Sequence, residues 1–72
     1  MTTFTDRLAI LKTQSNSLQK TIAENVGLSL RSYQRYEKGE REPSLSVLIA
    51  LADYFDVSLD YLCGRSDEPE RR

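Results

Sequence analysis

Amide and cationic side chains gather between residues 19 and 41 of this 72-residue chain. The members of this polar set are Gln19, Arg31, Gln34, Arg35, Lys38 and Arg41. A guanidinium donates hydrogen bonds in a fixed fork, an amide both donates and accepts, and an ammonium is a compact positive charge. Groups of this kind bind phosphates and the edges of nucleic-acid bases. Their spacing predicts non-covalent recognition of a polyanion.

The side chains that perform covalent or metal chemistry are scarce in this sequence. There is no histidine, and the single cysteine, Cys63, has no motif around it. Gly27, Gly39 and Gly64 each follow an expected helix, so they form neither a phosphate loop nor a dinucleotide fingerprint. We therefore expect a protein that is not an enzyme, with no catalytic residue, no metal, no cofactor and no small-molecule substrate.

Length and composition indicate one small globular domain. The chain is 39% hydrophobic, which is ample for a folded core and too much for a disordered tail. No apolar run approaches the roughly 20 residues that a membrane span needs, and no signal-peptide pattern opens the chain. A lone cysteine forms no intrachain disulfide, so we expect a buried Cys63 thiol and a reducing cytoplasm.

Charge is divided unevenly along the chain, although the formal net charge is only −1. Residues 17–41 hold five bases and three acids, a net charge of +2, whereas residues 42–64 hold four acids and no base. The folded molecule should therefore have a cationic side and an anionic side. Such a dipole can orient itself on a polyanion, although its field is weaker than that of a strongly basic protein.

Apolar residues recur with a period near 3.6, and no stretch alternates as a strand would. We expect five helices, at about residues 4–13, 18–26, 30–38, 45–55 and 59–63. Residues typical of helix starts precede them, namely the Thr3–Asp6 pair, Ser17, Ser29, Ser44 and Ser58. The residues expected to face inward include Phe4, Leu8, Leu11, Leu18, Ile22, Ala23, Val26, Tyr33, Tyr36, Leu45, Leu48, Ala52 and Phe55.

The second and third expected helices form a helix-turn-helix. Ala23 is small enough to let the two helices approach, and Gly27 permits the sharp turn because glycine adopts positive φ without steric cost. Tyr33 and Tyr36 anchor the third helix to the domain. The opposite face of that helix then projects outward and fits the major groove of B-DNA. The residues on this outward face are Leu30, Arg31, Gln34 and Arg35.

Each outward side chain suggests a contact. Arg31, near the helix N-terminus, is suited to two hydrogen bonds with guanine, and Leu30 to a thymine methyl group. Gln34 can read adenine or hold a phosphate, and Arg35 can reach a base edge or the backbone. The residues expected on the DNA backbone are Gln19, Ser29, Lys38 and Arg41. The alternative is that this helix face is merely solvated and that the lysine and arginine side chains beside it are ordinary exposed cations.

This pattern resembles the Xre/Cro-type helix-turn-helix of phage repressors and bacterial regulators over about residues 4–64. The motifs that carry the resemblance are Ser17-Leu18-Gln19, residues 22–29, Tyr36-Glu37-Lys38-Gly39 and Pro43-Ser44, continued by Leu48, Leu51-Ala52, Phe55, Val57-Ser58-Leu59 and Tyr61-Leu62. The resemblance implies an all-α, compact five-helix, lambda-repressor-like DNA-binding domain, with the helix-turn-helix formed by helices 2 and 3.

The resemblance also implies roles for individual positions. Gln19 takes the place of the phosphate-contacting glutamine of the family. The usual base-reading positions are taken by Leu30, Arg31 and Arg35. Glu37 takes the place of a glutamate that often forms an ion pair with a lysine or arginine on the first helix. Lys12 is the candidate for that cation here. An ordinary exposed pair of Lys12 and Glu37 is the alternative.

A surplus of apolar residues lies on the fourth expected helix. Val47, Ala50 and Tyr54 follow at i, i+3 and i+7 on a face that ought to meet solvent, and Tyr61 of the fifth helix extends this patch. A helix that is apolar nearly all round is usually covered on more than one side. We expect a homodimer built on this patch, with two third helices in successive major grooves. A monomer with an apolar surface is the alternative.

The sequence thus predicts a sequence-specific, double-stranded DNA-binding transcriptional regulator, most simply a repressor acting on a palindromic operator. The predicted organisation is a helix-turn-helix domain over residues 1–64 and a polar C-terminal tail over residues 65–72, frayed or acting as a linker. The chain is then a complete small regulator or the N-terminal piece of a larger one. The rival function is a protein-interaction module on the same scaffold, in an antitoxin-like or controller-like role.

Overall fold

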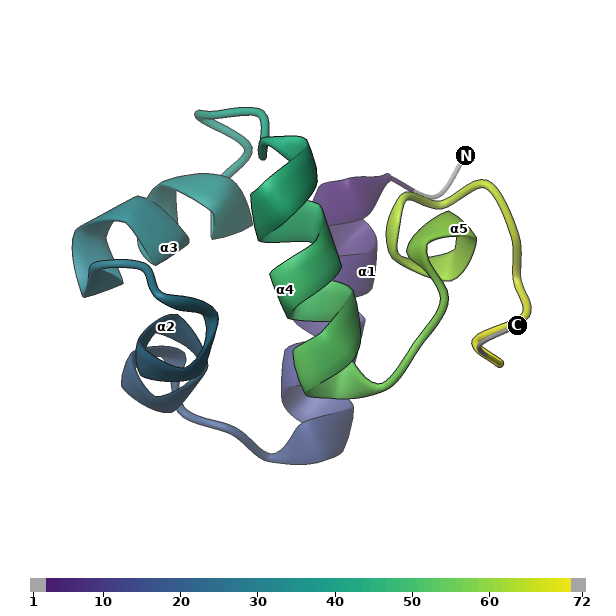
Figure 1. Ribbon diagram of the computed structural model, residues 1–72, viewed down its shortest axis with the longest axis horizontal. Coiled ribbons are helices and arrows are strands. Elements are labelled where there is room, and N and C mark those ends of the chain that lie inside the picture. Colours follow the sequence, from purple (N-terminus) through teal and green to yellow (C-terminus); the bar gives the residue numbers. More distant parts are fainter. Residues whose placement is uncertain (1–2, 71–72) are drawn as a thin grey trace.

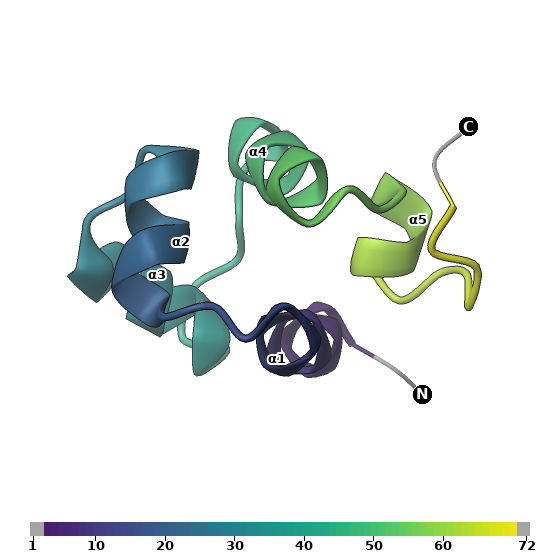
Figure 2. The same cartoon turned by 90° about the horizontal axis from the view of Figure 1, so that it is seen from below.

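Five α-helices form the described part of the chain, which is residues 3–70 of the computed structural model. They are α1 (Phe4–Ser15), α2 (Gln19–Val26), α3 (Leu30–Glu37), α4 (Leu45–Phe55) and α5 (Leu59–Leu62). Helices α2 and α3 lie at one end of the molecule and α5 lies at the other, with α1 and α4 between them (Figure 1, Figure 2). The predicted all-α, five-helix fold is confirmed.

The described residues cover most of the predicted domain and tail. Residues 1, 2, 71 and 72 of those predictions lie outside them. Within residues 3–70, no helix combines the length and the apolarity that crossing a bilayer requires.

Side-chain caps fix the start of four helices. Thr3 and Asp6 form a reciprocal capping box at the start of α1, in which each side chain accepts a backbone N–H of the other residue. The hydroxyl that caps each of α3, α4 and α5 accepts a backbone N–H from the first turn of its helix, and these hydroxyls belong to Ser29, Ser44 and Ser58. These predicted helix starts are confirmed.

The interpretation of Ser17 as the cap of α2 is wrong. The chain leaves α1 through Asn16, whose backbone is left-handed with φ 54°, and Leu18 then occupies the cap position of α2 without a side-chain hydrogen bond. The Ser17 hydroxyl instead shares a 3.0 Å hydrogen bond with the hydroxyl of Tyr54 on α4. The Ser17 hydroxyl, which the sequence preference for serine at helix starts assigns to capping, is therefore used in a contact between distant parts of the chain.

The core draws apolar residues from all five helices. Its buried apolar residues are Leu8, Leu11, Ile22, Ala23, Tyr33, Tyr36, Leu51, Ala52, Val57, Tyr61 and Leu62. Most residues predicted to face inward belong to this set or pack against it. Leu18 and Leu45 are corrections, because 72% and 67% of their surfaces are exposed. Both stand at helix N-termini, where Cα–Cβ bonds tilt toward the open end of the helix, so their side chains project past the core.

The turn between α2 and α3 is the sharp corner that the sequence predicts. Gly27 has a left-handed backbone with φ 76°, and a Cβ atom placed there would meet no atom within 4 Å beyond its two chain neighbours. Glycine is therefore favoured by the backbone conformation and not by a lack of space. Ala23 is buried, and its carbonyl accepts the Leu28 N–H at 2.9 Å, which closes the end of α2 as the chain turns into α3.

Residues 65–70 fold back beside α5, so the expectation of a frayed tail is wrong for this segment (Figure 1). The Ser58 N–H donates to the Pro69 carbonyl at 3.0 Å, and the Arg7 guanidinium on α1 donates to the Asp67 carboxylate at 2.6 Å. Polar contacts between distant residues hold this segment, and a reading based on apolar periodicity does not reveal them. Cys63, expected to be buried, is only partly buried.

Shortening Leu51 should lower the free energy of unfolding by about 2–5 kcal/mol. Leu51 is fully buried on α4, so Leu51→Ala leaves a cavity in the core. Leu18→Ala is the matched control, because it deletes the same atoms at an exposed site and should cost less than about 0.5 kcal/mol. Urea unfolding followed by circular dichroism measures both variants, and equal losses would contradict the described burial.

Candidate nucleic-acid interface

Helix α3 has one buried face and one exposed face. Tyr33 and Tyr36 are buried on the inner side. The residues exposed on the other side are Leu30, Arg31 and Arg35. The predicted outward presentation of these three side chains is confirmed, and their contact with DNA stays a prediction.

Gln34, the fourth residue predicted on this face, is held by a neighbouring amide. Its Nε2 donates to Oε1 of Gln19 on α2 at 3.1 Å. Nε2 of Gln19 in turn donates to Oε1 of Glu37, the last residue of α3, at 2.5 Å. All three residues are partly buried, so competing water has limited access to these hydrogen bonds. Two glutamines predicted to meet DNA separately are therefore joined to each other.

The ion pair implied by the family resemblance is present. Nζ of Lys12 on α1 lies 3.7 Å from Oε2 of Glu37 on α3, and 33% and 16% of the two side chains are exposed. The pair is thus partly shielded from solvent and is not an ordinary exposed pair. Together with Gln19 and Gln34 it forms a polar network (Lys12, Glu37, Gln19 and Gln34) that connects α1, α2 and α3.

The hydroxyl of Tyr33 adds a buried polar group next to this network. Burial, together with the neighbouring Glu37 carboxylate, raises the pKa of Tyr33, so the phenol stays protonated over the physiological pH range. Sequence reasoning finds only an apolar, anchoring role for Tyr33. A signal was available, because the hydroxyl of a buried tyrosine usually requires a polar neighbour.

The residues predicted on the DNA backbone stand at different ends of α2 and α3 and differ in exposure. Gln19 begins α2 inside the polar network. The Ser29 hydroxyl accepts the Ser32 N–H at 3.1 Å and donates to the Ser32 hydroxyl at 3.0 Å, so its proton is already used within α3. Lys38 and Arg41 are exposed beyond the C-terminal end of α3. Phosphate contacts from the exposed Lys38 and Arg41 therefore require less rearrangement than contacts from Gln19 or Ser29, whose polar groups are already hydrogen-bonded.

The apolar patch predicted on α4 and α5 is placed differently in the structure. Tyr61 is only 7% exposed, because α5 packs against α1 and the Arg7 guanidinium lies 4.0 Å from the centroid of the Tyr61 ring. The expectation that Tyr61 lies on the surface is therefore wrong. Val47, Ala50 and Tyr54 are partly buried, and Val47 and Tyr54 pack against the core. The large exposed apolar residues of these two helices are Leu45, Ile49 and Leu59.

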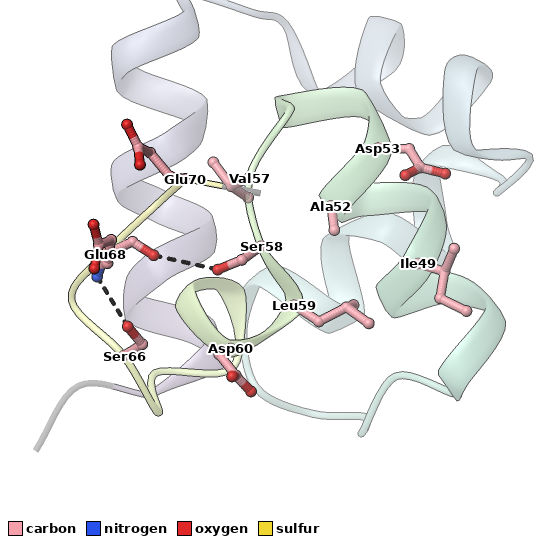
Figure 3. A pocket seen from close by; sticks show the side chains of 10 residues that line it. All are labelled: Ile49, Ala52, Asp53, Val57, Ser58, Leu59, Asp60, Ser66, Glu68 and Glu70. Atoms are coloured by element: carbon pink, nitrogen blue, oxygen red, sulfur yellow. Dashed lines mark hydrogen bonds between the residues drawn. The ribbon is translucent and has the colours of Figure 1, made fainter. Parts of the chain in front are cut away.

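A groove of about 530 Å³ opens between α4, α5 and the folded-back tail (Figure 3). Ile49 and Leu59 contribute to its apolar lining. The acidic residues that line it are Asp53, Asp60, Glu68 and Glu70. Because this groove borders α5, it lies toward the end of the molecule away from α3 (Figure 2). The acidic lining of this groove and the exposed arginines of α3 therefore lie toward opposite ends of the molecule, in agreement with the predicted cationic and anionic sides.

The chain has named relatives among bacterial and phage proteins. A family model described as Helix-turn-helix matches residues 9–62. The cryptic phage CTXphi transcriptional repressor RstR of Vibrio cholerae is 42% identical over 60 residues, which cover 83% of this chain and 54% of that protein. The HTH-type transcriptional regulator AnsR of Bacillus subtilis is 44% identical over 66 residues, which cover 90% of this chain and 56% of that protein. The chain therefore spans little more than half the length of these relatives.

The fold has a counterpart in the P22 c2 repressor, whose crystal structure was determined in complex with a synthetic operator. The two structures agree with a TM-score of 0.84 over 92% of this chain and 100% of that chain, at 24% sequence identity. An identity this low establishes a shared fold and nothing more specific.

Alkaline pH should destabilise the protein partly through Tyr33. Burial and the Glu37 carboxylate raise the pKa of Tyr33 in the folded state. Above about pH 10, the unfolded chain therefore loses this proton while the folded protein keeps it, and stability falls as the pH rises. Tyr33→Phe should remove part of that fall. Urea unfolding of both proteins between about pH 8 and about pH 11 tests this, and parallel losses would contradict it.

Proposed function

This chain belongs to the Xre/Cro-type helix-turn-helix family, and from that premise we propose that it is a sequence-specific, double-stranded DNA-binding transcriptional regulator. The observation that carries the proposal is the exposed cationic face of α3, turned outward by the burial of Tyr33 and Tyr36. The names of RstR and AnsR, and the operator bound by the P22 c2 repressor, support it. Repression by blocking polymerase is the simplest action for a domain of this size.

In the proposed complex α3 enters the major groove, which is about 12 Å wide and admits one helix. Arg31, in the first turn of α3, donates two hydrogen bonds to O6 and N7 of a guanine. Leu30 contacts the methyl group of a thymine. Arg35, one turn after Arg31, reaches a second base edge or a phosphate. Direct base contacts of this kind supply the sequence preference.

Phosphate contacts supply most of the affinity in this proposal. Gln19 stands at the N-terminus of α2, where free N–H groups and the positive end of the helix dipole favour an anion. Lys38 and Arg41 neutralise phosphates beside α3. Each neutralised phosphate releases counterions, so the affinity should fall steeply as the salt concentration rises. Repulsion between DNA and the anionic groove near α5 helps to orient the domain with α3 toward the duplex.

We also propose that the protein binds a palindromic site as a homodimer, with two copies of α3 about 34 Å apart in successive major grooves. Ile49 and Leu59 are exposed apolar residues that line the same groove. A second subunit that covers them would remove this apolar surface from water, which favours association. The partly buried Val47, Ala50 and Tyr54 stay predicted members of this interface.

Replacing Arg31 and Lys38 should separate base reading from charge. Arg31→Ala should abolish the preference at particular base pairs and cost roughly 1–3 kcal/mol on the preferred site. Lys38→Ala should weaken all duplexes alike and flatten the salt dependence by about one unit of slope. Selection from a random duplex pool and titrations at several salt concentrations measure both effects. Equal losses on every sequence for Arg31→Ala would contradict base reading, and no binding by the wild type would favour the rival interaction module.

Placing a charge in the proposed interface should separate the subunits. Ile49→Glu should convert a dimer into a monomer, because the new carboxylate meets an apolar surface and other carboxylates of the groove. Ile10→Glu on α1 is the matched control, since Ile10 and Ile49 are 40% and 43% exposed. Sedimentation equilibrium gives the masses. The dimer proposal fails if the wild type is already monomeric or if Ile49→Glu keeps the dimer mass.

A further inference from the structure

One end of the polar network has a fixed hydrogen-bonding polarity. An ammonium can only donate and a carboxylate can only accept, whereas a glutamine amide can present either end. Nζ of Lys12 lies 3.7 Å from Oε2 of Glu37, so Glu37 acts as an acceptor toward its neighbours. Gln19 must therefore turn its Nε2 toward Glu37, in agreement with the 2.5 Å hydrogen bond between them.

The same polarity is passed on to Gln34. With Nε2 of Gln19 directed at Glu37, Oε1 of Gln19 is left as an acceptor, and only an N–H group of Gln34 can satisfy it. The 3.1 Å hydrogen bond has this direction. Nε2 of Gln34 is therefore turned toward α2. Oε1 of Gln34 accepts no hydrogen bond within residues 3–70 and is not among the buried polar atoms without a partner, so it is accessible to solvent.

We propose that the Lys12–Glu37 ion pair sets the base preference of Gln34, by fixing the carbonyl oxygen of Gln34 toward the major groove. This inference rests on the proposed function. A fixed acceptor suits a base with an exocyclic amine at the groove edge, which means adenine through N6 or cytosine through N4. The same oxygen is repelled by O6 of guanine and O4 of thymine. Lys12 and Glu37 touch no base in this scheme and act as positioning residues.

Partial burial makes this orientation persistent. An exposed glutamine can rotate its amide by a half-turn, so its donor and acceptor exchange places and discrimination between bases is lost. Here the half-turn would place two oxygens, or two amide groups, face to face. Only 16% of the Glu37 side chain is exposed, and the buried Tyr33 hydroxyl lies beside its carboxylate, so water has little room to compensate for the lost hydrogen bonds.

Glu37→Gln tests the inference, because it removes the group that fixes the polarity. Lys12 then holds the oxygen of the new amide, the nitrogen of that amide turns toward Gln19, and both glutamines reverse. Selection from randomised duplexes is compared for the wild type, Glu37→Gln and Gln34→Ala, and Gln34→Ala identifies the base position that Gln34 reads. At that position the wild type should prefer adenine or cytosine at least about fivefold. Glu37→Gln should shift the preference toward guanine or thymine and leave the position read by Arg31 unchanged.

Two further variants serve as controls. Glu40→Gln makes the same change of charge at an exposed residue just after α3 and should keep all wild-type preferences. If circular dichroism shows that Glu37→Gln does not fold, Gln19→Met replaces it as the test. This variant removes the hydrogen bonds between Glu37, Gln19 and Gln34 and keeps the Lys12–Glu37 ion pair. It should reduce the preference at the Gln34 position to less than about twofold.

The outcomes distinguish this inference from the proposed function. A wild-type preference for guanine or thymine at the Gln34 position would overturn the inference. An unchanged preference at this position in folded Glu37→Gln or Gln19→Met would also overturn it. So would a Gln34→Ala variant that changes the preference at no position of the site. If the folded wild type binds no duplex at low salt, the proposed function is overturned, and this inference falls with it.

Discussion

The burial of Tyr33 is the constraint on which the arrangement of α3 depends. The helix has only eight residues, so its rotation about its own axis decides which side chains reach solvent. Tyr33 and Tyr36 are three residues apart and therefore lie on one face. Burying both of them turns Arg31 and Arg35 away from the core. Apolar packing thus determines the direction in which the cations point.

Polar contacts supply the directional information that apolar packing lacks. The hydrophobic effect is non-directional and tolerates small shifts between helices. The polar network has one donor and one acceptor at each step, and it connects α1, α2 and α3. The Tyr33 side chain borders both systems, since its ring lies in the core and its hydroxyl lies beside the Glu37 carboxylate. In a domain with so small a core, this overlap ties the orientation of α3 to the rest of the fold.

Local rules predict the features that depend on residues within one or two helical turns. The five helices, the turn at Gly27 and the outward face of α3 are of this kind. A periodic pattern misplaces Leu18 and Leu45 because it takes no account of helix ends. It misplaces Tyr61 because Arg7, the residue that covers the ring, is far away in the sequence. The hydrogen bonds of the polar network join residues 15 and 18 positions apart, so no short motif signals them.

The fold-back of residues 65–70 sets the direction of the polypeptide after α5. The Arg7–Asp67 ion pair and the hydrogen bond from Ser58 to Pro69 hold this segment beside α5, at the end of the molecule opposite α3 (Figure 2). A fluorophore or an affinity handle joined to this segment would therefore sit clear of the α3 face. The protein could be immobilised on a sensor chip through that end while its exposed arginines remain accessible from solution.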